Sequence, residues 1–260
     1  MGIITTITKK DLPLKYQNYQ LVQTSDGVSD SVYLLGSSYV LKIFENGTLA
    51  DMKNEQRLLF LLGNLQVPKC VEILQVKNRF SMIFTQIDGE SIKSPENIHI
   101  KQIGLFLKKT HRITKNKIST NEAIFKKKYL HNLILSSKNK TFLNYFNTIN
   151  CELKNDGIIH GDLFCDNAKF KDNILAGVFD FSEACNGDFL FDLAVVAFSW
   201  CFDEYTLNQK KLTVLLSNYG LDIEYEHFKE YIKYALLYYA TTRYINSRDY
   251  SELIKKLENI

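Results

Sequence analysis

Polar side chains are gathered between residues 157 and 181, in a segment whose flanks are apolar and strand-forming. His160, Asp162 and Asn167 stand in its first half, and Asp180 follows thirteen residues after the asparagine. A carboxylate can accept the proton of a substrate hydroxyl, and a carboxylate with an amide oxygen offers the hard ligands that Mg²⁺ prefers. Taken by itself, such a segment could also be an ordinary hairpin with Asp and Asn in its turns.

The spacing of these residues resembles the catalytic loop of protein kinases, in which H-x-D-L-x-x-x-N is followed by D-F-G. Here the His, Asp and Asn are followed by Asp180–Phe181. The resemblance implies phosphoryl transfer, which needs an acceptor hydroxyl in line with the γ-phosphate and metal to neutralise the phosphate oxygens. Asp162 would be the catalytic base and His160 a brace for the loop. Asn167 and Asp180 would hold Mg²⁺.

The stretch "YVLKIF" in the N-terminal part predicts a strand that carries Lys42, with Leu41 and Ile43 on the opposite face. A strand Lys paired with a helical Glu is how kinases hold the α- and β-phosphates. Glu55 lies thirteen residues later in a predicted helix, and we prefer it to Asp51 because it stands three residues before the apolar run "LLFLL". Without the loop described above, such a Lys would be more typical of a solvated strand edge.

The turn "TSDGVSDS" ahead of this strand has one glycine in place of the G-x-G-x-x-G of protein kinases. We expect its backbone amides and the hydroxyls of Ser25, Ser29 and Ser31 to contact the phosphates of ATP. An ordinary hairpin turn is the alternative. The stretch "MIFTQIDG" is expected to contact the adenine through backbone groups, with Thr85 and Ile87 as the candidates.

The elements that must position these residues fall into two parts of unlike character. Residues 1–85 predict an antiparallel sheet of about five strands with a helix over 49–65. Beyond them helical periodicity dominates, with 157–181 as the strand-like interruption. The helical stretches are 97–113, 120–150, 188–207 and most of the last fifty residues. The expected fold class is α+β, with a nucleotide-binding N-terminal lobe (1–85), a linker near 85–92 and a catalytic and substrate-binding C-terminal lobe (86–260).

The stretches "HGDLFCDN", "GVFDFSEA" and "FDLAV" together resemble the aminoglycoside phosphotransferase/choline kinase superfamily. This resemblance implies a two-lobed protein-kinase-like fold and the ATP- and Mg²⁺-dependent phosphorylation of a small-molecule hydroxyl. It also implies that a Ser-containing turn replaces the Gly-rich loop and that Asp192 of "DLA" braces the catalytic loop. Asp162 is the base in this comparison, and Asn167 and Asp180 are the metal ligands.

Residues 180–202 and 235–250 resemble more narrowly the kinase-fold homoserine kinases, which form O-phosphohomoserine in threonine biosynthesis. This resemblance implies that Glu183 attracts the ammonium group of the substrate. An ordinary surface carboxylate without a role in binding is the alternative interpretation of Glu183. Arg243 and Arg248 are candidates for the substrate's carboxylate, because Arg offers paired donors. Five residues apart on one expected helix, they would not share a face. An aminoglycoside, choline or other amino-alcohol kinase and, in another class, a non-catalytic pseudokinase are the alternatives.

Composition excludes several other classes of protein. A net charge of +3 with dispersed lysines does not indicate a nucleic-acid partner. The sequence has no run of 18 apolar residues, so we expect no membrane span. The N-terminus lacks the apolar core of a signal peptide. Five well-separated cysteines are typical of reduced thiols. We therefore expect a cytoplasmic enzyme, monomeric or homodimeric, that acts on a small molecule.

Overall fold

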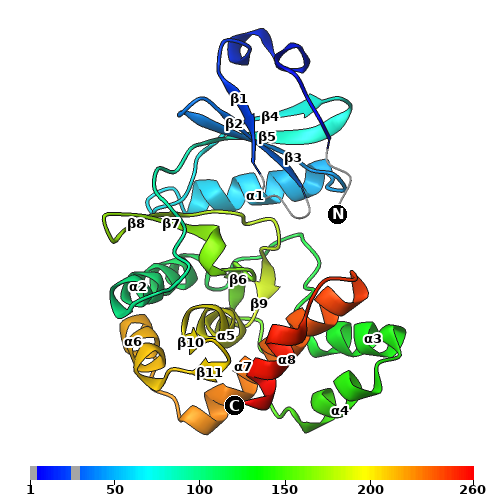
Figure 1. Ribbon diagram of the computed structural model, residues 1–260, viewed down its shortest axis with the longest axis vertical. Helices are drawn as coiled ribbons and strands as arrows, with labels where there is room; N and C mark the ends of the chain where they lie inside the picture. The colour runs from blue at the N-terminus through cyan, green and yellow to red at the C-terminus, as the bar shows by residue number, and fades with distance from the viewer. Residues whose placement is uncertain (1–4, 25–29) are drawn as a thin grey trace. The chain divides into compact units, whose positions relative to one another are not determined.

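Five strands and one helix form the N-terminal part of the computed structural model, which describes residues 5–24 and 30–260. The chain divides into two compact units, Met1–Asp88 and Gly89–Ile260, each of which is described by itself. In the first unit the antiparallel strands lie in the order β1-β2-β3-β5-β4 (Figure 1). Their bounds are β1 (Leu21–Gln23), β2 (Ser31–Leu35), β3 (Tyr39–Ile43), β4 (Cys70–Val76) and β5 (Arg79–Thr85). The expected antiparallel sheet of about five strands is present, and its first three strands, β1, β2 and β3, pair in sequence order.

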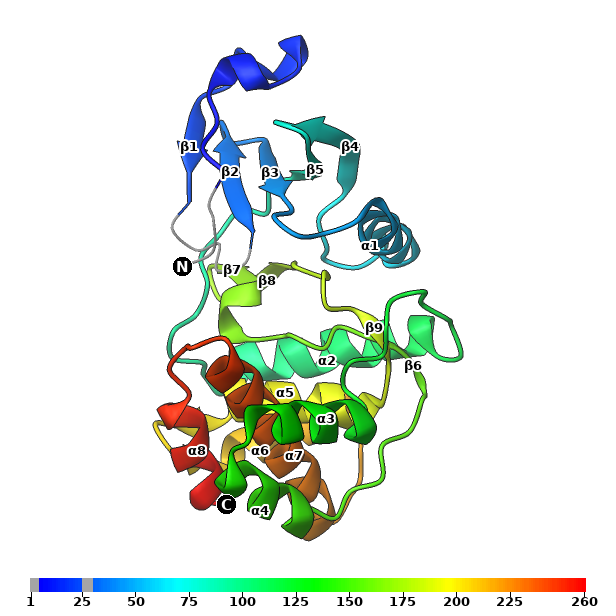
Figure 2. The same cartoon turned by 90° about the vertical axis from the view of Figure 1, so that its right-hand side faces the viewer.

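Alternation along β3 gives this sheet two unlike faces. Leu41 and Ile43 belong to a buried cluster that also includes Tyr16 and Ile83. Lys42 faces the other side and is paired in register with Met82. Helix α1 (Leu49–Leu61) contacts β4 at the end of the sheet (Figure 2). It ends four residues earlier than the expected 65.

The second unit is built around α5 (Phe189–Trp200), which is apolar on all sides and therefore buried. Helices α2, α6 and α7 contact it (Figure 1). The helices of this unit are α2 (Asn97–Thr114), α3 (Lys127–Ser137), α4 (Lys140–Thr148), α5, α6 (Gln209–Tyr219), α7 (Tyr225–Ile245) and α8 (Ser251–Glu258). In the ranges that the structure describes, every helix is too short or too polar to cross a lipid bilayer.

Short strand pairs interrupt the helices. β6 (Gly157–Ile159) pairs with β9 (Cys185–Gly187), and β7 (Ala168–Lys171) pairs with β8 (Ile174–Val178). The turn between β7 and β8 has positive φ at Asp172 and Asn173, as two-residue hairpin turns require. β9 and the hairpin of β10 (Phe202–Asp203) and β11 (Thr206–Leu207) were not expected. The expected helix over 188–207 therefore ends at Trp200.

Candidate functional site

The strand β6 leads directly into the loop that carries His160 and Asp162, and a 3-10 turn (Cys165–Asn167) then leads into β7. Asp180 follows β8 and has a φ of +63°. A positive φ is uncommon for a residue with a side chain, and such conformations cluster at active sites. Within the second unit, the structure thus brings together Asp162, Asn167 and Asp180 around two strand ends.

Asp192 of α5 ties this loop to the centre of the unit. Its carboxylate accepts hydrogen bonds from the backbone N–H groups of His160 (2.9 Å) and Gly161 (2.8 Å). A third partner is Nε2 of His111 at 2.9 Å, whose Nδ1 lies 2.8 Å from the Tyr219 hydroxyl. Burial works to raise the pKa of Asp192, but the hydrogen bond and charge of His111 hold it below its ordinary value. Asp192 is therefore a buried carboxylate with three donors.

His111 of α2 is a polar member of the site that was not among the expected site residues. It stacks on Phe189 with a ring-centroid separation of 4.0 Å. Its contact with Asp192 spans 81 residues of sequence, so no local pattern could identify Asp192 as its partner. The sequence signal would have been a polar side chain on the buried face of α2.

His160 braces the loop from inside. Its Nδ1 accepts the N–H of Asp162 at 3.2 Å, and its Nε2 lies 3.1 Å from the carbonyl oxygen of Phe179. Burial lowers the pKa of His160. The ring is therefore neutral, with the proton on Nε2 donated to Phe179, and it links the two stretches that carry Asp162 and Asp180.

The Asp162 carboxylate is a strong proton acceptor for a carboxylate. Burial, followed by the charges of Asp180, Glu183 and Asp166, raises its pKa to about 8. A general base works best when its pKa lies near the working pH. The environment of Asp162 therefore suits a group that takes a proton from a hydroxyl.

Asn167 and Asp180 fit a magnesium ion by the chemistry of their donor atoms. The Nδ2 of Asn167 donates to the backbone oxygen of Asp162 at 2.7 Å and to its Oδ2 at 3.2 Å. This leaves the amide oxygen as the ligand atom of Asn167. One oxygen of Asp180 accepts from the Ser182 hydroxyl at 2.7 Å. Among residues 5–24 and 30–260 no three His, Cys, Asp or Glu residues are grouped as a metal site. Two protein ligands suit Mg²⁺, which keeps waters and phosphate oxygens in its coordination sphere.

In the first unit, Lys42 is only 8% exposed and its Nζ lies 3.4 Å from Oδ2 of Asp30. Asp30 was not among the expected site residues. Glu55 is buried on α1, whereas the carboxylate of Asp51 closes a capping box with Thr48. Because Asp51 caps the start of α1, Glu55 is the better of the two acidic candidates for a partner of Lys42. A direct Lys42–Glu55 pair stays a prediction.

The predicted phosphate turn needs a correction at Ser31. Its side chain is 2% exposed, and its hydroxyl lies 2.5 Å from Oε1 of Glu45 and accepts the N–H of Thr5. A phosphate cannot reach this hydroxyl, so Ser31 is a structural residue of the sheet. Ser25 and Ser29 lie outside the described residues.

Thr85 ends β5, and Ile87 lies just beyond it. The N–H of Thr85 donates to the carbonyl of Lys69, and its hydroxyl accepts the N–H of Lys69. Thr85 could therefore offer adenine its carbonyl rather than its N–H. The adenine contacts stay a prediction.

The expected substrate arginines lie at the end of α7. Arg243 is helical, but Arg248 follows the helix, which ends at Ile245 because Ser247 adopts a left-handed conformation. The N–H of Arg248 then closes back on the carbonyl of Arg243 at 2.8 Å, as in a Schellman motif. The expectation that both arginines share one helix was wrong.

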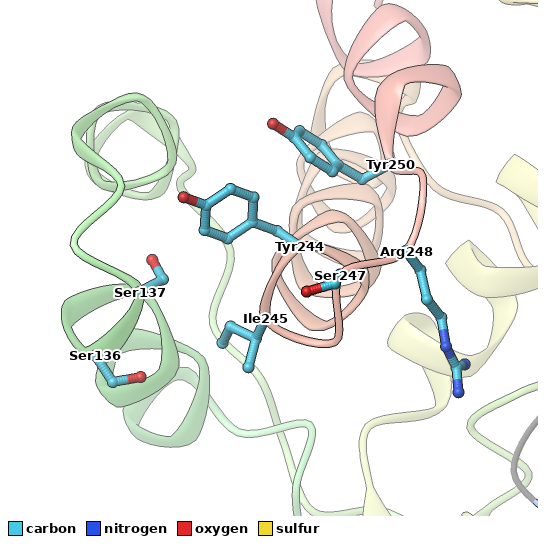
Figure 3. A pocket seen from close by; sticks show the side chains of 7 residues that line it. All are labelled: Ser136, Ser137, Tyr244, Ile245, Ser247, Arg248 and Tyr250. Carbon is cyan, nitrogen blue, oxygen red and sulfur yellow. The ribbon is translucent and has the colours of Figure 1, made fainter. Parts of the chain in front are cut away.

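Arg248 lines a pocket of about 610 Å³ between the end of α3 and the turn after α7. Figure 3 shows the Arg248 side chain extending away from Tyr244 and Tyr250. The full lining is Ser136, Ser137, Tyr244, Ile245, Ser247, Arg248 and Tyr250. It contains none of the loop residues, so the structure does not join Arg248 to Asp162 in one pocket.

Tyr239 of α7 is a further site residue that the sequence did not reveal. Its hydroxyl donates to the carbonyl oxygen of Gly161, and it lies close enough to Asp162 to oppose the rise in the pKa of that carboxyl. Glu183 lies close enough for its charge to raise the pKa values of both Asp162 and Tyr239. Asp162, Glu183 and Tyr239 are thus neighbours in the second unit.

Comparison with known proteins agrees with this geometry. A profile of the phosphotransferase enzyme family matches residues 20–209. A homoserine kinase of Bartonella tribocorum (strain CIP 105476 / IBS 506) is 26% identical over 251 residues, which cover 84% of this chain and 79% of that protein.

Solved structures share the fold. The GDP complex of wild-type aminoglycoside 2'-phosphotransferase-IIIa superposes with a TM-score of 0.67 at 16% identity, covering 93% of this chain and 91% of that one. The streptomycin-ATP-APH(2")-IIa ternary complex gives a TM-score of 0.65 at 21% identity, covering 94% and 92%. The chain has the expected α+β, protein-kinase-like fold. It belongs to the phosphotransferase enzyme family and is a kinase.

Proposed function

We propose that the chain is an ATP- and Mg²⁺-dependent homoserine kinase that forms O-phosphohomoserine. The observation that carries the reaction type is the Asp162 carboxylate, which sits in a fixed loop with its pKa raised to about 8. The similarity to a homoserine kinase over 84% of the chain favours homoserine as the acceptor.

In this proposal Asp162 accepts the proton of the acceptor hydroxyl while that oxygen bonds to the γ-phosphorus and the bond to the departing ADP breaks. Asn167 and Asp180 would hold Mg²⁺, which when bound neutralises charge on the phosphate oxygens. The hydrogen bonds from Asn167 to Asp162 mean that the same residue also orients the base.

Lys42 and Glu55 are proposed to serve the α- and β-phosphates, and the backbone at Thr85 and Ile87 the adenine. The ion pair of Lys42 with Asp30 supports this assignment, because it shows a buried ammonium already engaged by an anionic group. A phosphate would take the place of that carboxylate or share the ammonium with it.

For the acceptor, Glu183 is proposed to attract the ammonium, because its charge acts directly on Asp162. Arg243 and Arg248 are proposed for the carboxylate of homoserine. An aminoglycoside would need several carboxylates for its ammonium groups. Two acidic residues that follow Glu183 in the sequence already have other partners. Asp188 caps α5, and Asp203 pairs with Lys211 at 2.6 Å.

The test is ADP release measured with homoserine, choline, ethanolamine and kanamycin as acceptors. We expect turnover with homoserine and its loss in Asp162→Asn, which should still bind ATP. Turnover with kanamycin and none with homoserine would replace the substrate assignment. Phosphorylation by Asp162→Asn at the wild-type rate would refute the role of the base.

A further inference from the structure

The peptide group between Gly161 and Asp162 is held at both of its polar ends. Its N–H, which belongs to Asp162, donates to Nδ1 of His160 at 3.2 Å. Its carbonyl oxygen, which belongs to Gly161, accepts the hydroxyl of Tyr239. Because the peptide group is planar, a rotation about ψ of Gly161 carries the whole group with it and moves the Cα of Asp162 and the direction of its side chain. Both contacts therefore bear on where the carboxylate points.

Gly161 makes such a constraint necessary. Its φ is +79°, and a Cβ on this residue would lie 2.3 Å from the ring of Phe125. Only glycine fits, yet glycine is the residue with the widest choice of backbone conformations. Asp192 fixes the peptide on the N-terminal side of Gly161 through a 2.8 Å hydrogen bond. Tyr239 fixes the peptide on the C-terminal side, next to the base.

Tyr239 is itself rigidly placed. It projects from the long helix α7, and its ring packs edge-on against Phe164 with a centroid separation of 4.9 Å. Phe198 of α5 lies 5.5 Å from it on the same measure. Burial, with the charge of Asp162 next, raises the pKa of Tyr239 well above its usual value, so the hydroxyl keeps its proton and donates it.

We propose that Tyr239 is a positioning residue for phosphoryl transfer, whose hydroxyl fixes the Gly161–Asp162 peptide and thereby aims the Asp162 carboxylate at the acceptor hydroxyl. This inference rests on the proposed role of Asp162 as the base and is independent of which acceptor is used. A misplacement of about 1 Å in a reacting group can cost about 10²-fold in rate. Loss of the contact should therefore lower the rate of transfer without weakening the binding of either substrate.

The test compares Tyr239→Phe with the matched control Tyr231→Phe. Tyr231 lies on the same helix, is buried, and donates its hydroxyl to the carbonyl oxygen of Glu152 at 2.9 Å. Both variants keep the ring and lose one partly buried hydrogen bond from a phenol to a carbonyl oxygen. Thermal unfolding and calorimetric binding of ATP verify that each variant is folded before kcat and KM are measured.

We expect kcat to fall at least tenfold in Tyr239→Phe, with both KM values within about threefold of wild type, and to stay within twofold in Tyr231→Phe. Three results would overturn the inference. They are an equal fall in kcat in the two variants, an effect of Tyr239→Phe that is confined to KM, and a kcat of Tyr239→Phe within twofold of wild type. The measurement uses whichever acceptor of the panel the wild-type enzyme phosphorylates, so a wrong substrate assignment leaves this result interpretable. Asp162→Asn is assayed in parallel, and its activity separately decides the role of the base.

Discussion

Replacing Asp162 by Asn should make the stability of the second unit less dependent on pH. The folded state raises the pKa of this carboxyl from 3.8 to about 8, so it binds the proton more tightly than the unfolded chain does. This proton-linked stabilisation is complete below about pH 4 and is lost as the pH rises through about 8. Asn is neutral at every pH and removes the effect.

The magnitude follows from the size of this pKa change. A tenfold difference in proton affinity is worth about 1.4 kcal/mol, so the full effect is about 6 kcal/mol, of which about 4 kcal/mol falls between pH 5 and pH 8. We therefore expect the free energy of unfolding of Asp162→Asn, relative to wild type, to be about 4 kcal/mol higher at pH 8 than at pH 5. Relaxation of the loop would reduce this difference, and 1 kcal/mol is the smallest value that agrees with the reasoning.

The assay is urea unfolding at the two pH values, with EDTA and without nucleotide. Trp200 is the single tryptophan, is buried, and donates its indole N–H to the carbonyl of Leu163 at 3.0 Å. Its fluorescence therefore reports on the unit that holds Asp162. The control variant Asp172→Asn removes an exposed carboxylate from the β7–β8 turn of the same unit and should follow the wild type. Parallel pH profiles for wild type and Asp162→Asn would refute the reasoning.

Three further substitutions separate effects on substrate binding from effects on folding stability. Lys42→Ala should raise the KM for ATP at least tenfold with little change in the KM for the acceptor, and an unchanged KM for ATP would contradict its assignment. Asp192→Asn should lower the free energy of unfolding by about 3 kcal/mol in urea titrations, because an amide turns a donor toward buried N–H groups, and it should also lower kcat. Ser31→Ala should cost about 1 kcal/mol through the lost bond to Glu45 and leave the KM for ATP unchanged; a raised KM would restore its contact with phosphate.

Features with a local cause could be predicted from the sequence. Alternation with a period of two is a property of the strand itself, so the opposite faces of Leu41 and Lys42 follow from the sequence alone. The loop over 157–181 was predictable because its polar residues stand at fixed intervals between apolar strands.

Features that depend on packing could not be predicted. The bonds of Asp192 with His111 and of Gly161 with Tyr239 span 81 and 78 residues, and they exist because α2 and α7 both pack against α5. The end of α7 could not be predicted from the sequence for a different reason. Its left-handed residue is Ser247, where glycine would have marked a helix end in the sequence.

The bond from Tyr239 to Gly161 also has a consequence for the order in which the protein matures during synthesis. The ribosome adds Gly161 first and Tyr239 78 residues later. A nascent chain can form β6 and the loop that follows it, but the peptide next to Asp162 gains its second anchor only when α7 has been translated and has docked. The catalytic loop therefore reaches its final conformation late, and a partly synthesised chain that already contains every loop residue should have little transferase activity.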